Sequence, residues 1–538
     1  MPTPQSDPQL PSVSEFYAGK NVFITGVTGF LGKVAIEKLL RSCPEVKGIY
    51  CLIRPKKGEA GEERLKHVLK TELFDKVREE QPDFESKLHA IHGDVLQNEL
   101  GISEENRRLL ARVVNVIVHS AATVKFDEHI RISVELNVIA VRRMVQFAKT
   151  IENLEVFAHV STAYANCEKE TIEESVYPPP FEPQKIIDIL SWMDDETLAL
   201  ITPKLLGDKP NTYTLTKHLG EALLVEEGAG LNLTIIRPSI ITAIWKDPIK
   251  GWIDNYNGPS GLYIATGKGM LKSMLGCTKN VADIVPVDLN ANLIISAVWH
   301  TALTKPSQPV IYHMTSGSSN PFTWGQIATV INGFFHRIPL DKCFRRPNVV
   351  LTPHSLLHEY WLFASHMVPA YIYDVAVSIV GGKPKMVKVY SKLHKMMKVL
   401  EYFVLHEWQW NHNNTDELQE AMSCEDRENF YFDVSKIHWQ TYTENYCLGT
   451  KMFLLKEDLT SLPAARAHIK RLRNIRYLFN SLLGIFFWYL LIARSSLARN
   501  SLILVMRLFA KFLRFFKLTA SLAMSKPYSV YFKHVKKL

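Results

Sequence analysis

The first part of the chain alternates short apolar runs with stretches in which apolar residues recur at helical spacing. Residues 21–25 (NVFIT) form a short apolar run that predicts a buried strand, and the periodicity of residues 30–40 predicts a helix. Further strands are expected at residues 48–53, before His92, up to His119 and before Ser161. Strands that alternate with helices indicate one doubly wound (Rossmann) parallel α/β sheet.

The pattern changes after about residue 350, where helical stretches replace this alternation. We expect residues 15–350 to form the α/β part, with a lobe at about residues 246–350 that returns a strand or helix to the sheet. Residues 354–457 mix aromatic and basic residues and are expected to form a helical C-terminal domain. The length of 538 residues exceeds one typical core, which agrees with more than one folded part.

Within the helical region, residues 361–380 are apolar for most of their length. His366, Pro369 and Asp374 interrupt the run, whereas a spanning helix needs about 20 continuous apolar residues. We therefore expect a buried or interfacial helix. At the other end, residues 1–14 carry four prolines among polar residues, so we expect a disordered lead-in and no secretory signal peptide.

Charge is concentrated at the C-terminus. The net charge is +9, but after Asp458 the chain has no acidic residue and 15 Lys and Arg, which leaves 48 basic and 54 acidic residues before it. The tail, residues 458–538, is therefore strongly basic. Nucleic-acid binding would explain the charge and leave the many Leu and Phe of the tail without a role, so we expect membrane lipid as the partner and no nucleic acid.

Two segments of the tail are expected to contact that membrane. Residues 477–493 are an uncharged run of 17 residues, at the short limit of a spanning helix. Residues 500–518 predict an amphipathic helix with an interfacial cationic stripe. The alternative is a soluble helical hairpin. The stripe consists of Arg507, Lys511, Arg514 and Lys517.

A glycine-rich turn joins the first strand to the first helix. Gly26, Gly29 and Gly32 in TGVTGFLG let the backbone approach a pyrophosphate, to which the helix N-terminus offers N–H groups and a positive dipole. A plain turn is the alternative. Asp94 is placed for an adenine amino group. The expected dinucleotide-binding residues are Thr25, Gly26, Thr28, Gly29, Phe30, Leu31, Gly32, Arg54, Asp94, Val95, Ala121, Ala122 and Lys217.

The end of the second strand indicates which dinucleotide is bound. An acid there favours NAD through the ribose hydroxyls, whereas a basic residue suits a 2′-phosphate. Here the chain continues with Arg54, Pro55, Lys56 and Lys57 and has no acid. NADPH is therefore the expected cofactor, although Lys56 and Lys57 fit a solvated loop equally well.

A second motif, YTLTK, indicates what the dinucleotide is used for. Tyr213 and Lys217 stand four residues apart on a predicted helix and share one face. A free phenol has a pKa near ~10; we expect the Lys217 ammonium to lower it, so that Tyr213 delivers a proton to a carbonyl oxygen as hydride reaches the carbon. Ser161 and Thr162 end the preceding strand and offer a hydroxyl to polarise that carbonyl, with Thr162 favoured.

These residues resemble an extended short-chain dehydrogenase/reductase, and the whole chain resembles an alcohol-forming fatty acyl-CoA reductase of the insect type. The resemblance covers about residues 15–520 and rests on TGVTGFLGKVAIEKLLRSCPEVKGIYCLIRPKKG, VSTAYANC, KPNTYTLTKHLGE, ADIVPVDL, TSGSSNPFTWGQI and GGKPKMVKVYSKLHKMM. It implies two NADPH-dependent hydride transfers, from long-chain fatty acyl-CoA to aldehyde with release of CoA, and from aldehyde to fatty alcohol. It also implies that the C-terminal domain helps to receive the acyl chain; a structural helical cap is the alternative.

Cysteine and histidine patterns narrow the chemistry. The seven cysteines are scattered and contain no C-x-x-C, which fits reduced packing residues and neither a disulfide framework nor a zinc site. His406 and Glu407 begin a metalloprotease-like motif, but Trp410 stands where its second histidine belongs. The thioester chemistry needs no cysteine nucleophile, because the hemithioacetal collapses and expels the CoA thiolate.

Two alternatives to this function remain open. One is another membrane-bound extended reductase, either aldehyde-forming or a hydroxysteroid dehydrogenase. The other is a cofactor-binding scaffold without turnover, which need not retain Tyr213 and Lys217. The expected location is the endoplasmic reticulum or peroxisomal membrane, with the catalytic domain facing the cytosol; Lys536-Lys537-Leu538 resembles a peroxisomal address only weakly.

Overall fold

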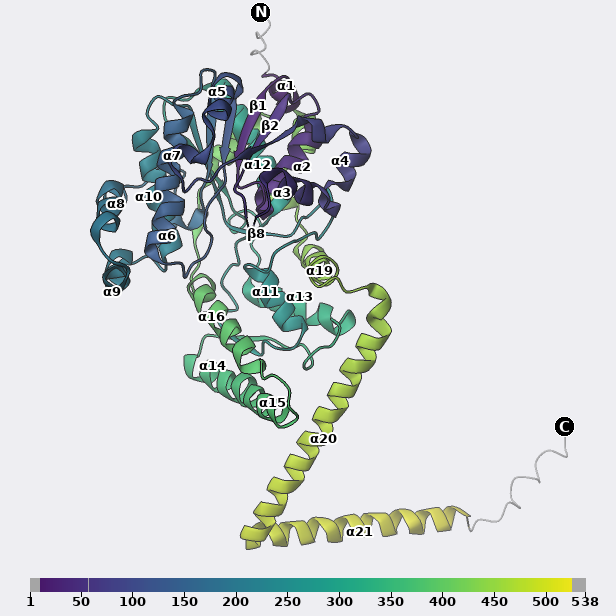
Figure 1. Cartoon of the computed structure of the whole chain (residues 1–538). Helices are drawn as coiled ribbons and strands as arrows, with labels where there is room; N and C mark the ends of the chain where they lie inside the picture. The colour runs from purple at the N-terminus through teal and green to yellow at the C-terminus, as the bar shows by residue number, and fades with distance from the viewer. Residues whose placement is uncertain (1–9, 57, 525–538) are drawn as a thin grey trace, which may run out of the picture. The chain divides into compact units, whose positions relative to one another are not determined.

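The computed structural model describes residues 10–56 and 58–524. Its centre is a seven-stranded sheet of parallel neighbours in the order β11-β7-β5-β4-β1-β2-β3 (Figure 1). The strands are β1 (Asn21–Thr25), β2 (Gly48–Ile53), β3 (Leu88–His92), β4 (Val116–His119), β5 (Val156–Val160), β7 (Leu233–Pro238) and β11 (Val310–Met314). This order confirms the predicted doubly wound fold.

Helices cover both faces of the sheet, which explains why its strands are apolar runs without alternation. Every position of β1, β5 and β7 is buried. Helices α2 (Phe30–Ser42) and α12 (Val287–Thr304) pack together on one face, and α7 (Ala140–Ala148) packs with α10 (Thr212–Glu227) on the other (Figure 1).

The strand order reverses between β1 and β4, so a crevice is expected at their carboxyl ends. There Thr25 is in register with Leu52 of β2 and with His119 of β4. His119 is in turn in register with His159 of β5. The ends of four strands therefore meet at one edge of the sheet.

Shorter helices complete the N-terminal part. Helix α1 begins after Ser12, whose hydroxyl accepts a hydrogen bond from the Glu15 N–H, and Val13 is buried. The predicted disordered lead-in is therefore wrong from Ser12 onward, and residues 1–9 lie outside the described residues. The helices are α1 (Val13–Tyr17), α3 (Gly61–Leu69), η1 (Glu72–Phe74), α4 (Asp75–Glu80), η2 (Phe84–Lys87), η3 (Asn98–Gly101), α5 (Glu104–Val113), α6 (Ile130–Val134), η4 (Glu135–Ile139), η5 (Ala163–Asn166), α8 (Pro183–Trp192) and α9 (Asp195–Leu206).

Residues 239–352 form two small parallel pairs outside the main sheet and contribute β11 to the sheet. The substrate-side lobe expected at about residues 246–350 stays a prediction. Strand β8 pairs with β10, and β9 pairs with β12. The elements are β8 (Ile240–Thr242), α11 (Pro259–Gly267), β9 (Ser273–Leu275), β10 (Ile284–Pro286), α13 (Trp324–Arg337) and β12 (Val350–Thr352).

The C-terminal helices pack against the α/β part, and residues up to Arg466 form one compact unit. Strand β13 pairs with β6, and the Tyr442 hydroxyl lies 2.6 Å from Thr242 Oγ1. The domain boundary near residue 350 stays a proposal. The elements are β6 (Thr171–Ile172), α14 (Ser355–Trp361), η6 (Leu362–Met367), α15 (Val368–Ile379), α16 (Met386–Leu405), β13 (Gln409–Trp410), α17 (Asn413–Ala421), α18 (Cys424–Asn429), η7 (Val434–Lys436), α19 (Trp439–Gly449), η8 (Thr450–Leu454) and η9 (Leu459–Ser461).

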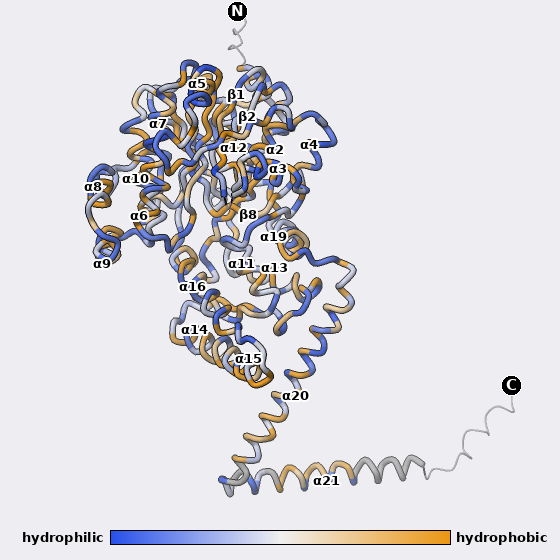
Figure 2. The backbone as a smooth tube through the Cα atoms, viewed as in Figure 1, coloured by the Kyte–Doolittle hydropathy of each residue, from blue (hydrophilic) through white to orange (hydrophobic). Residues whose placement is uncertain are grey.

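A second unit begins at Ala467 and is helical where it is described. It contains most of α20 (Leu462–Arg494) and all of α21 (Ser496–Met524). Helix α20 is hydrophilic in its first half and hydrophobic towards its end (Figure 2). The predicted segment 477–493 forms this hydrophobic end, and its described large apolar side chains are exposed. The predicted helix 500–518 lies within α21, but the side chain of Lys517 lies outside the described set.

One helical stretch of the described residues, Ser355–Ile379, is long and apolar enough to cross a membrane. It includes all but the last residue of the segment 361–380, for which we expected a buried or interfacial helix. The buried alternative is wrong, because only 11% of its most apolar window is buried. The predicted spanning segment 477–493 ends in residues whose side chains the structure does not describe, so it stays a proposal.

Candidate active site

A cavity of about 1280 Å³ opens at the carboxyl ends of β1, β2, β4 and β5. Its wall includes almost every predicted site residue, although these come from distant parts of the sequence; Lys217 alone of that set is not part of the wall. The predicted residues in the wall are Thr25, Gly26, Thr28, Gly29, Phe30, Leu31, Gly32, Arg54, Asp94, Val95, Ala121, Ala122, Ser161, Thr162 and Tyr213.

The glycines of the turn are required by close backbone packing. Gly26 adopts φ +78°, and a Cβ there would meet Ala121 N at 2.9 Å. A Cβ on Gly32 would clash with Gly26 O, so the first turn of α2 can pack against the preceding turn only with glycine at this position. Gly29 is the N-cap residue of α2 and brings no side-chain capping group. The first N–H groups of α2 are therefore presented to the cavity, as a phosphate site requires.

Thr25 links the turn to the neighbouring strand. Its hydroxyl accepts hydrogen bonds from the N–H groups of Ser120 and Ala121, both at 3.1 Å, and lies 2.8 Å from His119 Nδ1. Burial, reinforced by the charge of Lys217, lowers the pKa of His119 to about 3, so this imidazole is neutral at physiological pH. The neutral ring can accept a hydrogen bond at Nδ1, which fits the Thr25 hydroxyl as the donor.

Two arginines lie at the end of β2. Arg54 is half exposed, and its Nη1 lies 4.0 Å from Asp94 Oδ2. Arg64, on α3, donates hydrogen bonds to Arg54 O and, at 3.4 Å, to Thr28 Oγ1. Both arginines line the cavity. The sequence reasoning missed Arg64, because it belongs to no motif and reaches this place only through the packing of α3; Lys57 lies outside the described residues.

Tyr213 and Lys217 lie one turn apart on α10, with the residues of the β5 end beside them. The Tyr213 ring stacks on Phe126 at 5.3 Å between ring centroids. Lys217 Nζ donates a hydrogen bond of 2.8 Å to Val160 O, the last residue of β5. Thr162 follows two residues later, and its hydroxyl accepts from the Tyr164 N–H at 3.3 Å. Tyr213, Ser161 and Thr162 therefore share one wall of the cavity.

The predicted lowering of the Tyr213 pKa by Lys217 is wrong in this structure. Burial raises the pKa of Tyr213 to about 12, against a smaller lowering by a hydrogen bond with Thr162. Burial also lowers the pKa of Lys217 to about 8, and the carboxylate of Glu221 offsets part of this effect. Both pKa values are thus shifted towards the neutral form, because desolvation outweighs the hydrogen bond of Thr162 at Tyr213 and the charge of Glu221 at Lys217.

A buried ion pair supports the helix that carries both residues. Glu221, one further turn along α10, accepts hydrogen bonds from Arg237 Nε at 3.0 Å and Nη2 at 2.7 Å. Burial alone would raise the pKa of Glu221, but the charge and hydrogen bonds of Arg237 lower it overall. Both side chains are essentially inaccessible to solvent. Arg237 thus keeps the Glu221 carboxylate ionised near Lys217.

A buried polar side chain on a π-helix connects α10 to the Thr123 segment of the cavity wall, and no motif in the sequence indicated it. Asn137, in η4, accepts a hydrogen bond from the Thr123 N–H at 3.0 Å and donates one to Thr216 Oγ1 at 3.0 Å. A Cβ on Gly220 would clash with Asn137 O. Glycine at this position lets α10 approach η4 closely enough for these contacts.

The C-terminal region supplies a further wall of the cavity, in addition to residues between Pro238 and Leu262. Helix α16 contributes Lys392, Lys395, Met396, Val399, Leu400, Phe403 and Val404. An aromatic cluster fixes this helix to the chain that follows Thr162. Trp408 Nε1 donates to Cys167 O at 2.8 Å and Trp410 Nε1 to Ala163 O at 3.2 Å. The HEWQW segment, which resembles a metalloprotease motif in sequence, thus attaches the C-terminal region to the chain after Thr162.

Family models match most of this architecture. An NAD-binding model described as male sterility protein matches residues 24–294, and a second model with the same description matches residues 365–457. The first match includes the glycine turn, Thr162, Tyr213 and Lys217. The second includes α16.

Curated relatives are similar over nearly the whole chain. Fatty acyl-CoA reductase 1 of Homo sapiens is 49% identical over 511 residues, which cover 95% of this chain and 99% of that protein. The protein of the same name from Mus musculus is 48% identical with the same coverage. Fatty acyl-CoA reductase 2 of Bos taurus is 46% identical over 510 residues, again 95% of this chain and 99% of that protein.

Solved structures support the fold at much lower identity. The terminal R domain from the myxalamid PKS-NRPS biosynthetic pathway has a TM-score of 0.54 and 18% identity, covering 82% of this chain and 92% of that one. The reductase domain of a nonribosomal peptide synthetase from Mycobacterium tuberculosis has a TM-score of 0.53 and 17% identity, covering 83% and 94%.

Proposed function

The chain belongs to the fatty acyl-CoA reductase family, and from that premise we propose that it reduces long-chain fatty acyl-CoA to primary fatty alcohol with NADPH, through an aldehyde and with release of CoA. The observation that carries the proposal is the single cavity in which the glycine turn, Tyr213 and the apolar side chains of α16 meet. One cavity with this lining accommodates a dinucleotide, a reacting carbonyl and an apolar chain.

The residues at the end of β2 support NADPH as the nicotinamide cofactor. Arg54 and Arg64 offer two guanidinium groups beside Thr28, and guanidinium groups bind phosphate in a bidentate manner. Asp94, the nearest acid, is paired with Arg54 and lies at the end of β3, where it suits the adenine. The first turn of α2 would hold the pyrophosphate. When bound, the reduced nicotinamide supplies the hydride.

We assign the carbonyl chemistry to Tyr213 and Thr162. Both present hydroxyl groups in one wall, where they stabilise the oxyanion that hydride attack creates at the thioester carbon; the Thr162 hydroxyl turns to it from Pro238 O, to which it donates at 3.4 Å. The raised pKa of Tyr213 keeps its phenol protonated at neutral pH, so it is ready to donate. The resulting hemithioacetal collapses, the carbonyl re-forms and the CoA thiolate leaves. The aldehyde is then reduced at the same site once a second NADPH has replaced the oxidised cofactor, with Tyr213 giving its proton to the alkoxide.

Lys217 acts beside Tyr213. Its ammonium is held at Val160 O, at the end of the strand that leads to Thr162. From there it stabilises the negative charge that Tyr213 acquires on giving up its proton, and we assign it the nicotinamide ribose as a second partner. Ser161 lies in the same wall and is the alternative hydroxyl to Thr162.

We further propose that the protein works on the cytosolic face of the endoplasmic reticulum or peroxisomal membrane, with residues 477–493 and 500–518 as lipid anchors. The exposed apolar side chains of the described part of α20 support this location. A long-chain alcohol is too apolar to be released freely into water, so discharge into a bilayer is favourable.

Lipid analysis in a host that lacks fatty alcohols tests the function. Expression of the full chain should produce long-chain primary alcohols, and Tyr213→Phe should abolish them while the protein still accumulates in membranes. Free aldehyde without alcohol would favour an aldehyde-forming reductase. Unchanged acyl-CoA together with an oxidised sterol would favour a hydroxysteroid dehydrogenase and contradict the proposal.

A further inference from the structure

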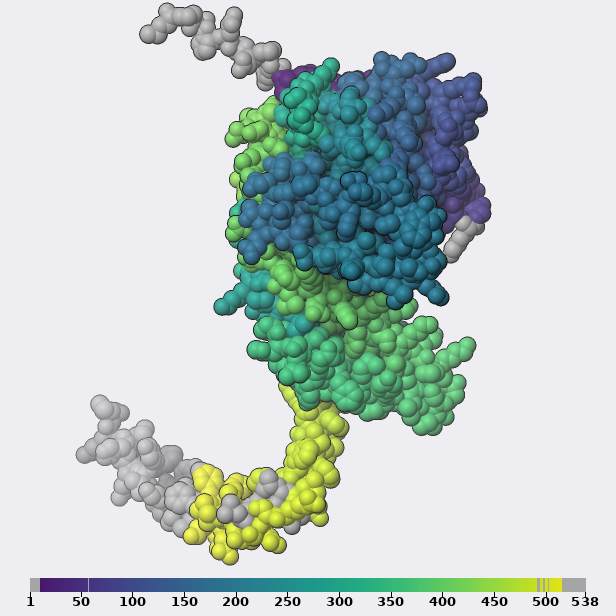
Figure 3. All heavy atoms as spheres, turned by 90° about the vertical axis from the view of Figure 1, so that its left-hand side faces the viewer, coloured from purple at the N-terminus to yellow at the C-terminus, as the bar shows by residue number. Residues whose placement is uncertain are grey.

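Residues 355–380 carry an exposed apolar surface within the first compact unit. Helices α14 and α15, joined by η6, project at the end of this unit that is remote from α5 (Figures 1 and 3). Each of ten large apolar side chains there is at least 45% exposed. They are Leu356, Leu357, Tyr360, Phe363, Tyr371, Ile372, Tyr373, Val375, Ile379 and Val380. A contiguous patch of this kind on a soluble surface marks an interaction site.

Three polar residues of the same stretch are buried against the protein. His358 Nδ1 lies 3.1 Å from Ser273 Oγ, and His366 Nε2 accepts a hydrogen bond from the Lys272 N–H at 3.0 Å. Asp374 caps α16, since its carboxylate accepts from the backbone N–H groups of Lys385, Met386 and Val387 at 2.9–3.0 Å. All three polar side chains are therefore engaged by the rest of the unit. These helices therefore bury polar side chains and expose large apolar ones, the reverse of an ordinary surface helix.

Lysines border the apolar face. The loop after α15 and helix α16 present Lys383, Lys385, Lys388, Lys392 and Lys398, all exposed. Lys395 is also on α16, but it pairs with Asp127 at 2.6 Å. Between Val375 and Leu400 the sequence has no acidic residue, and Glu359 is the exposed acid of α14. A hydrophobic patch with a basic border is complementary to an anionic lipid surface.

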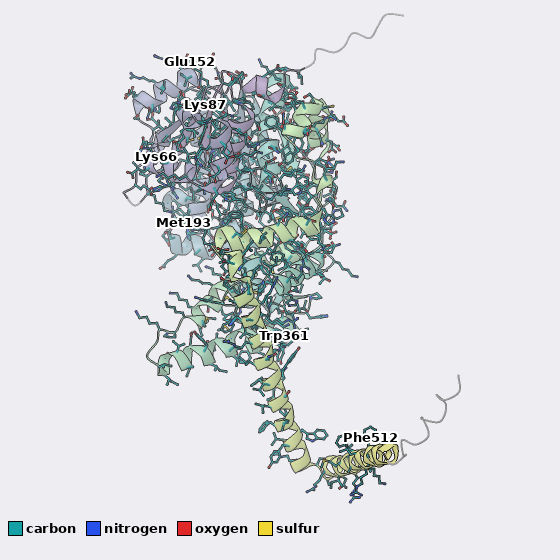
Figure 4. The ribbon with its side chains drawn as sticks, turned by 90° about the vertical axis from the view of Figure 1, so that its right-hand side faces the viewer. Lys66, Lys87, Glu152, Met193, Trp361 and Phe512 are labelled. Carbon is teal, nitrogen blue, oxygen red and sulfur yellow. The ribbon has the colours of Figure 1, made fainter. Side chains whose placement is uncertain are left out.

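We propose that residues 355–380 are a membrane-docking surface that lies in the interface of an anionic bilayer, with the lysines of α16 and its preceding loop on the lipid headgroups. The stretch lies along the membrane and does not cross it, because His358, His366 and Asp374 are held by the protein. Trp361, labelled in Figure 4, lies on this surface beside Lys272, whose Nζ is 5.6 Å from its ring centroid. This contact is separate from the two anchors proposed for the tail.

Docking through this surface also affects the reaction, because α16 connects the surface to the catalytic cavity. This step rests on the proposed function. Helix α16 packs against α15 on one side and lines the catalytic cavity on the other. Exposed Lys392 belongs to both the border and the cavity wall. Docking therefore places the cavity mouth near the headgroups, where a long-chain acyl-CoA resides.

Site-specific fluorescence in vesicles tests the surface on the full chain. In a Cys424→Ser background, which removes the exposed native thiol, a polarity-sensitive dye is attached at Ile379→Cys, or at Leu109→Cys on α5 as the matched control. Both native side chains are exposed. In phosphatidylserine-containing vesicles, lipids that carry a nitroxide near the headgroup should quench the dye at residue 379 several-fold more than the dye at residue 109. Iodide in the water should show the opposite order.

A charge variant and a topology measurement complete the test. Lys383→Glu combined with Lys388→Glu, both at exposed positions, should reduce the lipid quenching at residue 379 without changing alcohol formation from a water-soluble, short-chain substrate. Equal lipid quenching at residues 379 and 109 would overturn the proposal. Protection of residue 379 from both quenchers would indicate a second copy of the chain as the partner, and would overturn it too. Dyes at Leu356→Cys and Ile379→Cys that dithionite reaches from opposite sides would show a spanning helix and also contradict it.

Discussion

The pKa values of Tyr213 and Lys217 are both shifted from their ordinary values, each in the direction of the neutral form. The pKa of the phenol is raised to about 12 and that of the ammonium is lowered to about 8, in both cases chiefly by burial. Below pH 8 the site therefore holds a protonated phenol beside an ammonium. That pair can donate a proton and stabilise the anion left behind, which suits a reductase.

The pH dependence of the reaction should report Lys217. Over the range from pH 7 to 10 the phenol of Tyr213 stays protonated, whereas Lys217 loses its proton as the pH rises through about 8. We expect kcat/KM to fall on the alkaline side with this midpoint, because kcat/KM follows the free enzyme. In Lys217→Arg the remaining activity should persist to higher pH, since a guanidinium stays charged. An alkaline limb that does not move in this variant would assign it to another group.

Cofactor choice should depend on Arg54 and Arg64. Removing a charge-assisted hydrogen bond costs about 1.5–3 kcal/mol, so Arg64→Ala should raise the KM for NADPH by roughly 10- to 100-fold and leave that for NADH nearly unchanged. Arg108→Ala, at an exposed residue of α5 that pairs with Glu104, is the matched control. Steady-state kinetics with both cofactors measures the effect. An equal loss with NADPH and NADH would place Arg64 in a structural role.

Helix α10 is the element that determines the geometry of the site. It carries Tyr213, Lys217 and Glu221 on successive turns, and Asn211 caps it by accepting a hydrogen bond from the Thr214 N–H at 2.9 Å. Arg237 holds its middle through Glu221, and Asn137 of η4 reaches Thr216 on it. The catalytic side chains are positioned by these contacts more than by the local helix alone.

Substitutions at two helical glycines, one in close contact and one not, test this packing by comparison. A Cβ on Gly220 would clash with Asn137 O, whereas a Cβ on Gly333 in α13 meets only the end of the flexible Arg337 side chain at 3.9 Å. Gly220→Ala should therefore destabilise the protein by about 1–3 kcal/mol and lower kcat. Gly333→Ala should stabilise it by about 0.5–1 kcal/mol through helix propensity. Thermal denaturation of the two variants gives the comparison; a stabilised Gly220→Ala would refute the close approach of α10 to η4.

At this scale the sequence predicts much of the fold. Strand β1 and helix α2 are readable because a buried strand is an apolar run and the turn between them needs glycine. The functional consequence of burial is not readable, which is why the direction of the Tyr213 pKa shift was predicted wrongly. Arg64 and Trp410 were missed for another reason: only tertiary packing brings α3 to the end of β2 and β13 to β6.

Over the whole molecule, the N-terminal sheet and the C-terminal helices build one cavity. The sheet contributes the groups that fit a dinucleotide and the carbonyl chemistry, and α16 contributes an apolar wall with lysines at its outer end. The aromatic cluster of Tyr164, Phe403, Trp408 and Trp410 joins the two. Substrate length is therefore expected to depend on residues far from the catalytic motif.

Enlarging a side chain on the inner face of α16 should change chain-length preference. Val399 lines the cavity, whereas Val389 lies on the same helix, is exposed and is not part of the cavity wall. Val399→Trp should lower kcat/KM for long-chain more than for medium-chain acyl-CoA, because each methylene excluded from the cavity loses about 0.8 kcal/mol. Val389→Trp should leave the ratio unchanged. A ratio unaffected by Val399→Trp would place the acyl chain elsewhere.

The central claim is that one site performs two hydride transfers on a thioester. Its most direct test is the stoichiometry of purified full-length protein in vesicles with long-chain acyl-CoA, measured as NADPH oxidised, thiol released and lipid product formed. We predict two NADPH oxidised for each CoA released, with primary alcohol as the product and no turnover in Tyr213→Phe. One NADPH per CoA with accumulation of aldehyde, or full turnover in Tyr213→Phe, would contradict the account.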